Sequence, residues 1–377
     1  MILEHSEATE DRILLRESVI AMVRKVNPPE NLLERAETAS AGGTDSELWS
    51  ALSGDFAAPA LAVPEALGGV GATFAEAAVV LEELGAALAT VPYLSTFVAT
   101  EVLLAAAGCD VSDKWIPRLA AGEATATVIF DPVLIGDHAY AERSAPFAAQ
   151  QTPDGYTLSG TDEFVIDGAT ADLILIPVRD GSGCTLFAVE GRHLRRDAMH
   201  TLDPTRPLAV ITADDAPAEM VGTVGDAGQS LARARDLALL AIGCEQLGQS
   251  KTVLNMAVEY ARERIQFGRP IGSFQAIKHK LAEVAVAVQS AESAVEHGIW
   301  AAAKGTADEL SRAAAMVAMA CAPAAVLAAG ECIQVHGGIG FTWEHPAHLY
   351  YRRALSSAGL LGKPQHHAER LFELALG

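Results

Sequence analysis

Side chains suited to binding a dinucleotide are concentrated between residues 258 and 283. A helix over the first part of this stretch is predicted to end at Gly268, because glycine reaches the left-handed conformation that closes a helix and Pro270 cannot continue one. A loop over 269–273 and a second helix from Phe274 complete an αα-hairpin. A guanidinium, two amides and an aromatic ring at its tip can bind a diphosphate and a heterocyclic ring, and they belong to Arg264, Gln266, Phe267 and Gln275. A helix corner with chance polar residues is the alternative, since short motifs also arise by chance.

Five blocks of the sequence resemble the acyl-CoA dehydrogenase family. The stretch A-R-E-R-I-Q-F-G-R-P-I-G-S-F-Q-A-I-K-H-K-L-A (261–282) is similar to that family's FAD-binding hairpin. The other blocks follow the family's order, and they are A-V-P-E-A-L-G-G-V-G (62–71), E-E-L-G (82–85), G-Y-T-L-S-G-T-D-E-F-V-I-D-G-A-T-A-D (155–172) and Q-V-H-G-G-I-G-F-T-W-E-H-P (334–346). The resemblance covers nearly the whole chain and is more specific for the family than for the activity.

The pattern of the residues divides the chain into three parts. Residues 1–122 have apolar positions at helical spacing, β-rich runs separated by turn residues follow over 123–227, and the chain is helical again over 228–377. We therefore expect an α+β multidomain fold. As the resemblance implies, an N-terminal all-α domain is followed by a middle antiparallel β-barrel and a C-terminal bundle of the four-helix type. Pro323 predicts a kink or a break in the last part, because proline lacks a backbone donor.

The resemblance implies that FAD lies between the middle domain and the C-terminal bundle, with its adenosine end held by a neighbouring subunit. An oligomer is therefore expected. Arg264 matches the arginine that reaches the pyrophosphate across the subunit interface. A Q-x-x-G-G turn at 334–338 lets the backbone approach the phosphates, although a glycine-rich helix end would look the same. The residues expected to bind FAD are Arg264, Gln266, Phe267, Gln275, Gln334, Gly337 and Gly338.

The contacts to the isoalloxazine ring depart from the family's pattern. Where the family usually has T-E-x-x-x-G-S-D, this chain has F-D-P-V-L-I-G-D-H-A (130–139). At the second contact the family's W-I-T/S becomes F-V-I, so that Ile166 replaces a hydroxyl donor. An apolar side chain facing a polar ring edge weakens binding. We therefore do not expect this chain's own middle domain to hold the flavin ring.

The family's catalytic base is also missing from its usual positions. Counting along the matched blocks, these positions hold Leu361 and Ala238, and the adjacent arginine that helps to hold coenzyme A falls at Leu239. The nearest acids are Asp236 and Glu245, and Glu245 is a candidate base only for a substrate that lies deeper in the protein. A solvated or interface glutamate is the simpler interpretation, since Glu is mostly exposed.

Composition excludes several other classes of function. The net charge of −21 argues against nucleic acid or an anionic membrane as a partner, and the alanine-rich run at 313–329 is too weakly apolar to predict membrane insertion. Five scattered cysteines fit a reducing cytoplasm rather than a disulfide framework, and the start has no signal-peptide core. No metal site is expected: His336, His345, His366 and His367 lack the paired spacing with a carboxylate, and the last two are expected to be a surface pair.

Three functions remain open at this point. The favoured one is a subunit that completes the FAD site of a catalytic paralogue for the α,β-desaturation of an acyl-CoA, in an α2β2 heterotetramer such as the family uses on steroid side chains and similar bulky acids. The second is a self-sufficient homotetrameric dehydrogenase with Glu245 or Asp236 as an unusual base. The third is a scaffold subunit without flavin.

Overall fold

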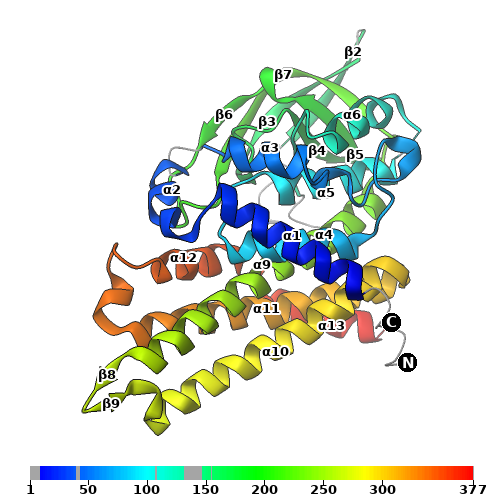
Figure 1. Cartoon of the computed structure of the whole chain (residues 1–377). Helices are drawn as coiled ribbons and strands as arrows, with labels where there is room; N and C mark the ends of the chain where they lie inside the picture. The colour runs from blue at the N-terminus through cyan, green and yellow to red at the C-terminus, as the bar shows by residue number, and fades with distance from the viewer. Residues whose placement is uncertain (1–8, 40–42, 107, 131–146, 154, 377) are drawn as a thin grey trace. The chain divides into compact units, whose positions relative to one another are not determined.

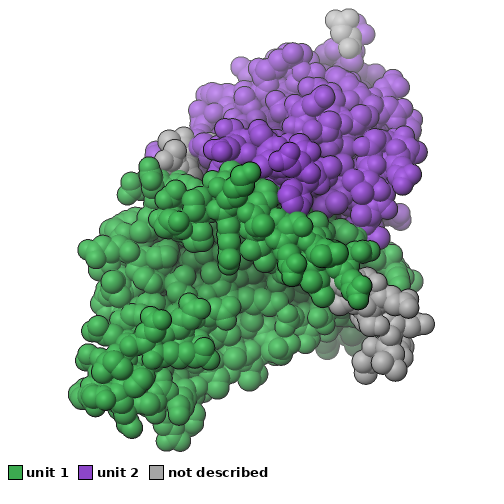
Figure 2. Space-filling view, viewed as in Figure 1, with its two compact units in different colours: residues 1–37, 74–89, 239–377 green, residues 38–73, 90–238 purple. Residues whose placement is uncertain are grey.

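The computed structural model describes residues 9–39, 43–106, 108–130, 147–153 and 155–376. The chain forms two compact units, coloured separately in Figure 2. The first unit comprises residues 1–37, 74–89 and 239–377, and the second comprises residues 38–73 and 90–238. This division cuts across the three predicted domains, whose boundaries remain a prediction.

In the sequence, the helices of the second unit come before and after the strands of its sheet. This is the order of helical and β-rich segments that the sequence predicts. Asp45 begins the first of them, because its carboxylate accepts a hydrogen bond of 2.9 Å from the backbone N–H of Leu48. The α-helices of this unit are α3 (Ser46–Gly54), α5 (Tyr93–Ala105), α6 (Asp110–Ala120) and the start of α9 (Gly228–Glu263).

The sheet of the second unit has seven strands in the order β1-β4-β5-β7-β3-β2, with β6 paired to β7 (Figure 1). The strands are β1 (Ala126–Val128), β2 (Phe147–Thr152), β3 (Gly155–Ile166), β4 (Leu173–Asp180), β5 (Gly183–Glu190), β6 (Arg195–Ala198) and β7 (Leu208–Val221). All described pairs are antiparallel, as predicted, except β1 with β4, which run parallel. The middle domain is therefore a mixed sheet. Ile174, Val189 and Ile211 lie in its fully buried core.

The first unit is made of long helices, and α10 and α11 lie side by side in it (Figure 1). Its α-helices are α1 (Thr9–Val26), α2 (Leu32–Ala39, which runs on into the other unit), α4 (Phe74–Ala86), most of α9, α10 (Gln275–Lys304), α11 (Ala307–His336), α12 (Ala347–Ser357) and α13 (Pro364–Leu376). A capping box starts α11: the Thr306 hydroxyl accepts from the N–H of Glu309, whose carboxylate accepts from the N–H of Thr306.

Two glycines let α4 and α9 cross at very short range. A Cβ on Gly248 of α9 would lie 1.9 Å from the carbonyl oxygen of Glu82, and one on Gly85 of α4 would lie 2.3 Å from that of Glu245. Such distances exclude any side chain, so this crossing requires glycine on both helices. Gly85 belongs to the E-E-L-G block, which gives that part of the family resemblance a structural reason.

The glutamates of the same block tie α4 to α1 and α9. Glu82 is buried, and its carboxylate lies 2.7 Å from the guanidinium of Arg16 and 2.9 Å from the ammonium of Lys251. Burial raises the pKa of Glu82, but the hydrogen bonds and charges of Arg16 and Lys251 outweigh it, and the net pKa is lowered. Glu83 pairs with Arg16 as well, so one arginine serves two carboxylates.

The longest apolar helix continues through its proline. α11 is one helix from Ala307 to His336, with Pro323 inside it; the predicted break does not occur. By length and composition alone the stretch Ala307–Phe341 is apolar enough to cross a membrane, contrary to the expectation for this run, but 61% of the apolar window is buried inside the chain. A mostly buried core helix passes the same test, so this is weak evidence for a membrane span.

Candidate cofactor and catalytic site

The predicted dinucleotide-binding tip is a small β-hairpin rather than a helix end. α9 ends at Glu263, five residues before the predicted Gly268, and the strands β8 (Ile265–Gln266) and β9 (Arg269–Pro270) pair antiparallel. Phe267 and Gly268 form the turn with φ of 54° and 77°. Two positive φ values in succession are typical of the two-residue turns that match the twist of paired strands. The glycine closes this turn instead of a helix.

The second helix of the hairpin begins as predicted, with α10 starting at Gln275 after Phe274. The ring of Phe274 anchors the tip, because the guanidinium of Arg269 lies 4.1 Å from its centroid and the ring of Phe267 packs edge-on at 6.0 Å. Phe267 is nevertheless 91% exposed. The ring of Phe267 is thus held by the turn and by Phe274 while most of it stays open to solvent, on a backbone conformation that bulky residues rarely adopt.

The polar residues of the tip also face solvent. Arg264 and Gln266 are exposed, and within the described part of the chain no carboxylate lies within ion-pair distance of Arg264. The side-chain amide of Gln266 donates 2.8 Å to the carbonyl of Ile265, and that of Gln275 lies 3.5 Å from the ring nitrogen of His279. The guanidinium of Arg264 is therefore available to an anion from outside this chain.

The glycine turn lies at the end of α11. Gly337 caps this helix with φ of 65°, and its N–H donates to the carbonyls of Gln334 and Ile333. Gln334, Gly337 and Gly338 are all exposed, and the space where a Cβ would stand on either glycine is open. The turn is therefore a glycine-rich helix end, as the alternative interpretation predicted. Its backbone is also accessible for the close approach that a phosphate needs.

A stack of aromatic rings joins the hairpin to the glycine turn. The ring of Tyr260, one helical turn before Arg264, stacks on His336 at 4.3 Å, and His336 contacts His345 at 4.2 Å. The Nδ1 of His336 lies 2.7 Å from the carbonyl of Cys332. The two FAD-binding elements predicted from separate parts of the sequence are therefore neighbours, held by rings on α9, on α11 and in the following loop.

This stack predicts a loss of stability in mild acid. Burial, followed by the charges of His336 and His348, lowers the pKa of His345 to about 4; burial also lowers the pKa of His336 and of His348, the latter helped by Arg352. Unfolded histidines take up protons near pH 6.5, so between about pH 6.5 and 4 the unfolded state binds more protons, and stability should fall as the pH falls.

Thermal melts at pH 7.5 and 5.5 measure this effect. His345→Phe keeps a ring in the stack without a titrating group and should reduce the difference in Tm between the two pH values, whereas His200→Gln, at an exposed position, should leave it unchanged. If the difference in Tm between the two pH values is equal in the unmodified protein and in both variants, His345 is not the source of the loss of stability in acid.

The positions predicted for the base and for its neighbouring arginine are apolar and buried. Leu361 is 6% exposed, Ala238 3% and Leu239 5%. Leu361 and Leu239 line a cavity of about 20 Å³ between α9, α11 and α12, which is room for roughly one water molecule. The cavity contains no carboxylate, because its other lining residues are Ile242, Gln246, Ala318, Ala322, Ser357, Ala358, Gly362 and His367.

Glu245 is a buried, paired acid, and the interpretation of it as a solvated glutamate is wrong. Its residue is 7% exposed, and its Oε2 lies 3.9 Å from Nη1 of Arg353, one of the largest fully buried side chains. Its backbone packs on Gly85 at the α4–α9 crossing. Glu245 does not line the cavity that contains Leu361. A role in holding α9 to α12 accounts for all of these contacts.

Asp236 is buried as well, at 2% exposure, and the guanidinium of Arg235 lies 2.9 Å from its carboxylate. The guanidinium of Arg235 therefore keeps the carboxylate of Asp236 in place from within the same helix. Asp236 does not line the cavity that contains Leu361.

The isoalloxazine contacts can be followed only in part. Residues 131–139 of the first departing segment lie outside the described residues. At the second, Phe164 is 48% exposed with φ of 63°, at a register shift between β3 and β7, and Val165 is buried beneath it. Ile166 is half-buried at the end of β3 and offers no hydrogen-bond donor to a ligand.

The histidines show no metal geometry. Among the described residues no group of three or more His, Cys, Asp or Glu side chains could hold a metal ion. His366 and His367 are not a surface pair before the last helix: they lie in α13, and His367 is 3% exposed.

Comparison with known proteins gives the same picture along the chain. A model described as the acyl-CoA dehydrogenase N-terminal domain matches residues 9–123, and one described as the acyl-CoA dehydrogenase C-terminal domain matches residues 230–373. The acyl-CoA dehydrogenase IpdE2 of Mycolicibacterium smegmatis is 36% identical over 363 residues, which cover 96% of this chain and 98% of the relative.

Two solved structures also match. The ChsE4-ChsE5 complex from Mycobacterium tuberculosis has a chain with a TM-score of 0.85 and 29% identity, over 98% of both chains. A variant of the Tcur3481-Tcur3483 steroid ACAD matches with a TM-score of 0.83 and 27% identity, over 96% of this chain and 97% of the other.

Proposed function

The chain belongs to the acyl-CoA dehydrogenase family, whose members are FAD-dependent oxidoreductases acting on the CH–CH bond of acyl-CoA thioesters, and from this premise we propose that it is a subunit that completes the FAD site of a catalytic paralogue. In this proposal the chain supplies the pyrophosphate and adenosine contacts, and the paralogue supplies the base and holds the flavin ring.

The residues that are present fit half of the cofactor. FAD, when bound, accepts the β-hydrogen of the substrate as hydride while a carboxylate removes the α-proton. The exposed guanidinium of Arg264 can pair with the pyrophosphate, and the open backbone at Gly337 and Gly338 can approach it. Phe267, held out at the tip, offers an aromatic face to the adenosine end.

The observation that carries the proposal is the missing base. The two positions at which we expect the family's carboxylate hold Leu361 and Ala238, and the cavity beside Leu361 has room for about one water molecule rather than a thioester. A chain that keeps the interface half of the cofactor site and loses the active-site half is suited to acting in trans.

The matched assemblies support a heteromer. ChsE4-ChsE5 is described as a complex, and the Tcur3481-Tcur3483 protein as a steroid ACAD. We extend this to the present chain as an α2β2 heterotetramer with one FAD per heterodimer, acting on a bulky acyl-CoA such as a steroid-derived one. A cytoplasmic location belongs to the same proposal and is supported by five free cysteines.

Co-expression tests the proposal. The chain alone should be colourless or poorly soluble, whereas the chain produced with an adjacent paralogue should be yellow, active and close to one FAD per heterodimer. Flavin absorbance per chain and mass in solution give both quantities. A stable homotetramer that carries one FAD per chain and desaturates an acyl-CoA unaided would overturn the proposal in favour of a self-sufficient enzyme.

The self-sufficient alternative rests on Glu245, a buried carboxylate of α9 that lies seven residues after Ala238 in the sequence. The scaffold alternative predicts a colourless complex as well as a colourless chain. The exposed Arg264 and the open glycine turn argue against it, since a scaffold does not need residues suited to binding an anion.

A further inference from the structure

His345 has a place beside the glycine turn that the FAD contacts described above do not explain. It is half-buried, it lies two residues before the start of α12, and its ring is 4.2 Å from the ring of His336. His336 immediately precedes Gly337 in the chain. The imidazole of His345 is therefore one ring away from backbone that is accessible to a phosphate.

The two nitrogens of His345 have different surroundings. The backbone N–H of Ala347, the first residue of α12, donates to Nδ1 at 3.3 Å. Nε2 makes no hydrogen bond within the described part of the chain, and it is not one of the enclosed polar atoms that lack a partner there. Nε2 is therefore accessible to a ligand from outside the chain.

The bond from Ala347 determines which nitrogen carries the proton. Burial, followed by the charges of His336 and His348, lowers the pKa of His345 to about 4, so the ring is neutral at pH 7. A neutral imidazole has a single N–H, and because Nδ1 accepts a hydrogen bond the proton is on Nε2. His345 thus offers a ligand one N–H donor and no charge.

His336 does not offer the same donor. Its Nδ1 lies 2.7 Å from the carbonyl oxygen of Cys332, to which it donates. In the neutral ring Nε2 is then left as an acceptor, and an acceptor does not bind a phosphate oxygen. Of the two histidines in contact beside the glycine turn, His345 is the one with a donor available to an anion.

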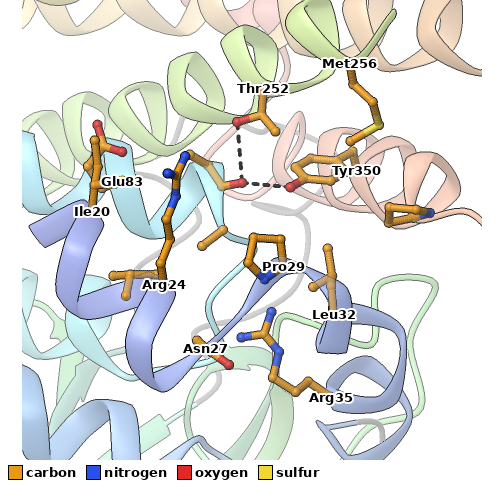
Figure 3. Close-up of a pocket in the computed structure, with 14 residues that line it drawn as sticks. Ile20, Arg24, Asn27, Pro29, Leu32, Arg35, Glu83, Thr252, Met256 and Tyr350 are labelled. Atoms are coloured by element: carbon orange, nitrogen blue, oxygen red, sulfur yellow. Dashed lines mark hydrogen bonds between the residues drawn. The ribbon is translucent and has the colours of Figure 1, made fainter. Parts of the chain in front are cut away.

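The start of α12 is held firmly enough to fix this donor in place. The hydroxyl of Tyr350, one turn into the helix, donates to the carbonyl of Ala86 of α4 at 2.8 Å, and the hydroxyl of Thr252 of α9 lies 3.5 Å from the same oxygen (Figure 3). Tyr350 is 4% exposed. A donor on an element that is already fixed loses little conformational freedom when a ligand binds.

His345 is also connected to the other groups expected to bind FAD. The ring of His336 contacts Tyr260 of α9 at 4.3 Å as well as His345, and Arg264 follows Tyr260 by one helical turn. A pyrophosphate has several anionic oxygens, each of which can accept a hydrogen bond. A guanidinium, backbone N–H groups of the turn and a neutral imidazole N–H can satisfy different oxygens of the same group.

We propose that His345 is a further FAD-binding residue, whose Nε2–H donates to a phosphate oxygen of the pyrophosphate. The inference rests on the FAD-binding role proposed above for Arg264 and the glycine turn, and it adds a residue of the loop that follows the turn. His345 also has a structural role, because its Nδ1 accepts from the start of α12. The two roles belong to different nitrogens and can be separated by mutation.

Two substitutions separate the nitrogens. His345→Asn places a side-chain oxygen where Nδ1 stands, so it keeps an acceptor for the N–H of Ala347 and has no donor at the place of Nε2. His345→Gln extends an amide N–H to the place of Nε2 and has no acceptor at the place of Nδ1. Both variants lose the ring and its contact with His336, so a comparison between the two cancels this shared loss.

Titration of FAD into the apo-assembly, followed by flavin fluorescence, measures the role of Nε2. His345→Asn should bind FAD about threefold to tenfold more weakly than His345→Gln, as expected for one partly solvated hydrogen bond. ADP, which carries the diphosphate and adenosine of FAD, should show the same order when it competes with FAD. Riboflavin, which has no phosphate, should bind both variants equally. The Tm of the apo-assembly should be higher for His345→Asn, which keeps the bond to α12.

Three outcomes would overturn the role of His345 in binding FAD. Equal FAD affinities of the two variants, or weaker binding by His345→Gln, would show that only the contact with α12 matters. An equal preference of riboflavin for His345→Gln would place the contact away from the phosphates. A homotetramer with one FAD per chain would contradict the subunit role proposed above, and the order of the two variants would still decide the role of His345.

Discussion

Replacing Arg264 with alanine is expected to weaken FAD binding by the assembled protein by about ten- to hundredfold, since a hydrogen bond to a charged group contributes roughly 1.5–3 kcal/mol and each 1.4 kcal/mol is tenfold. The expectation rests on position and exposure. The guanidinium follows the last turn of α9, it is exposed at a hairpin whose tip is fixed by Phe274, and no carboxylate of the described chain competes for it. The fold should be unaffected, because Arg264 makes no buried contact.

Arg262→Ala is the matched control. It removes the same charge from the same stretch of exposed chain, but it lies two residues away on the last turn of α9 and is not one of the predicted FAD contacts. Titration of FAD into the apo-assembly of each variant, followed by flavin fluorescence at fixed salt, gives the two affinities. If Arg264→Ala binds FAD as tightly as Arg262→Ala does, the hairpin has another purpose.

The hairpin also shows where sequence reasoning worked and where it failed. The polar residues that were predicted to lie at one tip are there and are exposed. The start of α10 was predicted to within one residue. The end of α9 was placed five residues late. Gly268 was interpreted as a helix cap, although Ile265 and the Phe-Gly pair before Arg269 are equally typical of two short strands around a two-residue turn. Local signals of this length do not distinguish the two closures.

Contacts between distant parts of the chain were beyond prediction from the residues alone. Gly85 and Gly248 are ordinary helix glycines in the sequence, and only the structure shows that each faces the other helix's backbone. The same holds for Glu245, which was interpreted as a solvated or interface acid because Glu is usually exposed and which is buried against Arg353. The stack of Tyr260, His336 and His345 combines three sequence positions that no periodicity connects.

The pair of Glu245 and Arg353 is expected to act in stability and not in catalysis. Both side chains are buried and their charged atoms lie 3.9 Å apart. Removing one partner of a buried ion pair costs about 3–5 kcal/mol. Arg353→Met should therefore lower the free energy of unfolding by roughly that amount. Glu245→Gln, which keeps an oxygen facing the arginine, should cost less, about 1.5–3 kcal/mol.

A double-mutant cycle separates this role from that of a base. If Glu245 and Arg353 hold α9 against α12, the double variant Glu245→Gln/Arg353→Met should lose less free energy of unfolding than the sum of the losses in the two single variants. The reason is that each single change already disrupts the contact that the other change would remove. Glu259→Gln, at an exposed glutamate of the same helix, should change stability by no more than about 0.5 kcal/mol. Urea unfolding of the purified assembly provides all four values.

Turnover of the same variants decides the function of the chain. An amide cannot remove the α-proton of an acyl-CoA, so a catalytic Glu245 would lose several orders of magnitude in kcat when replaced with glutamine, whatever the stability. Our expectation is that the Glu245→Gln assembly, measured well below its lower Tm and corrected for bound flavin, keeps a kcat close to that of the unmodified assembly. The carboxylate would then be structural, and the base would have to come from the partner, since Leu361 and Ala238 supply none. A collapse of kcat with intact assembly and flavin would instead make this chain the catalytic subunit.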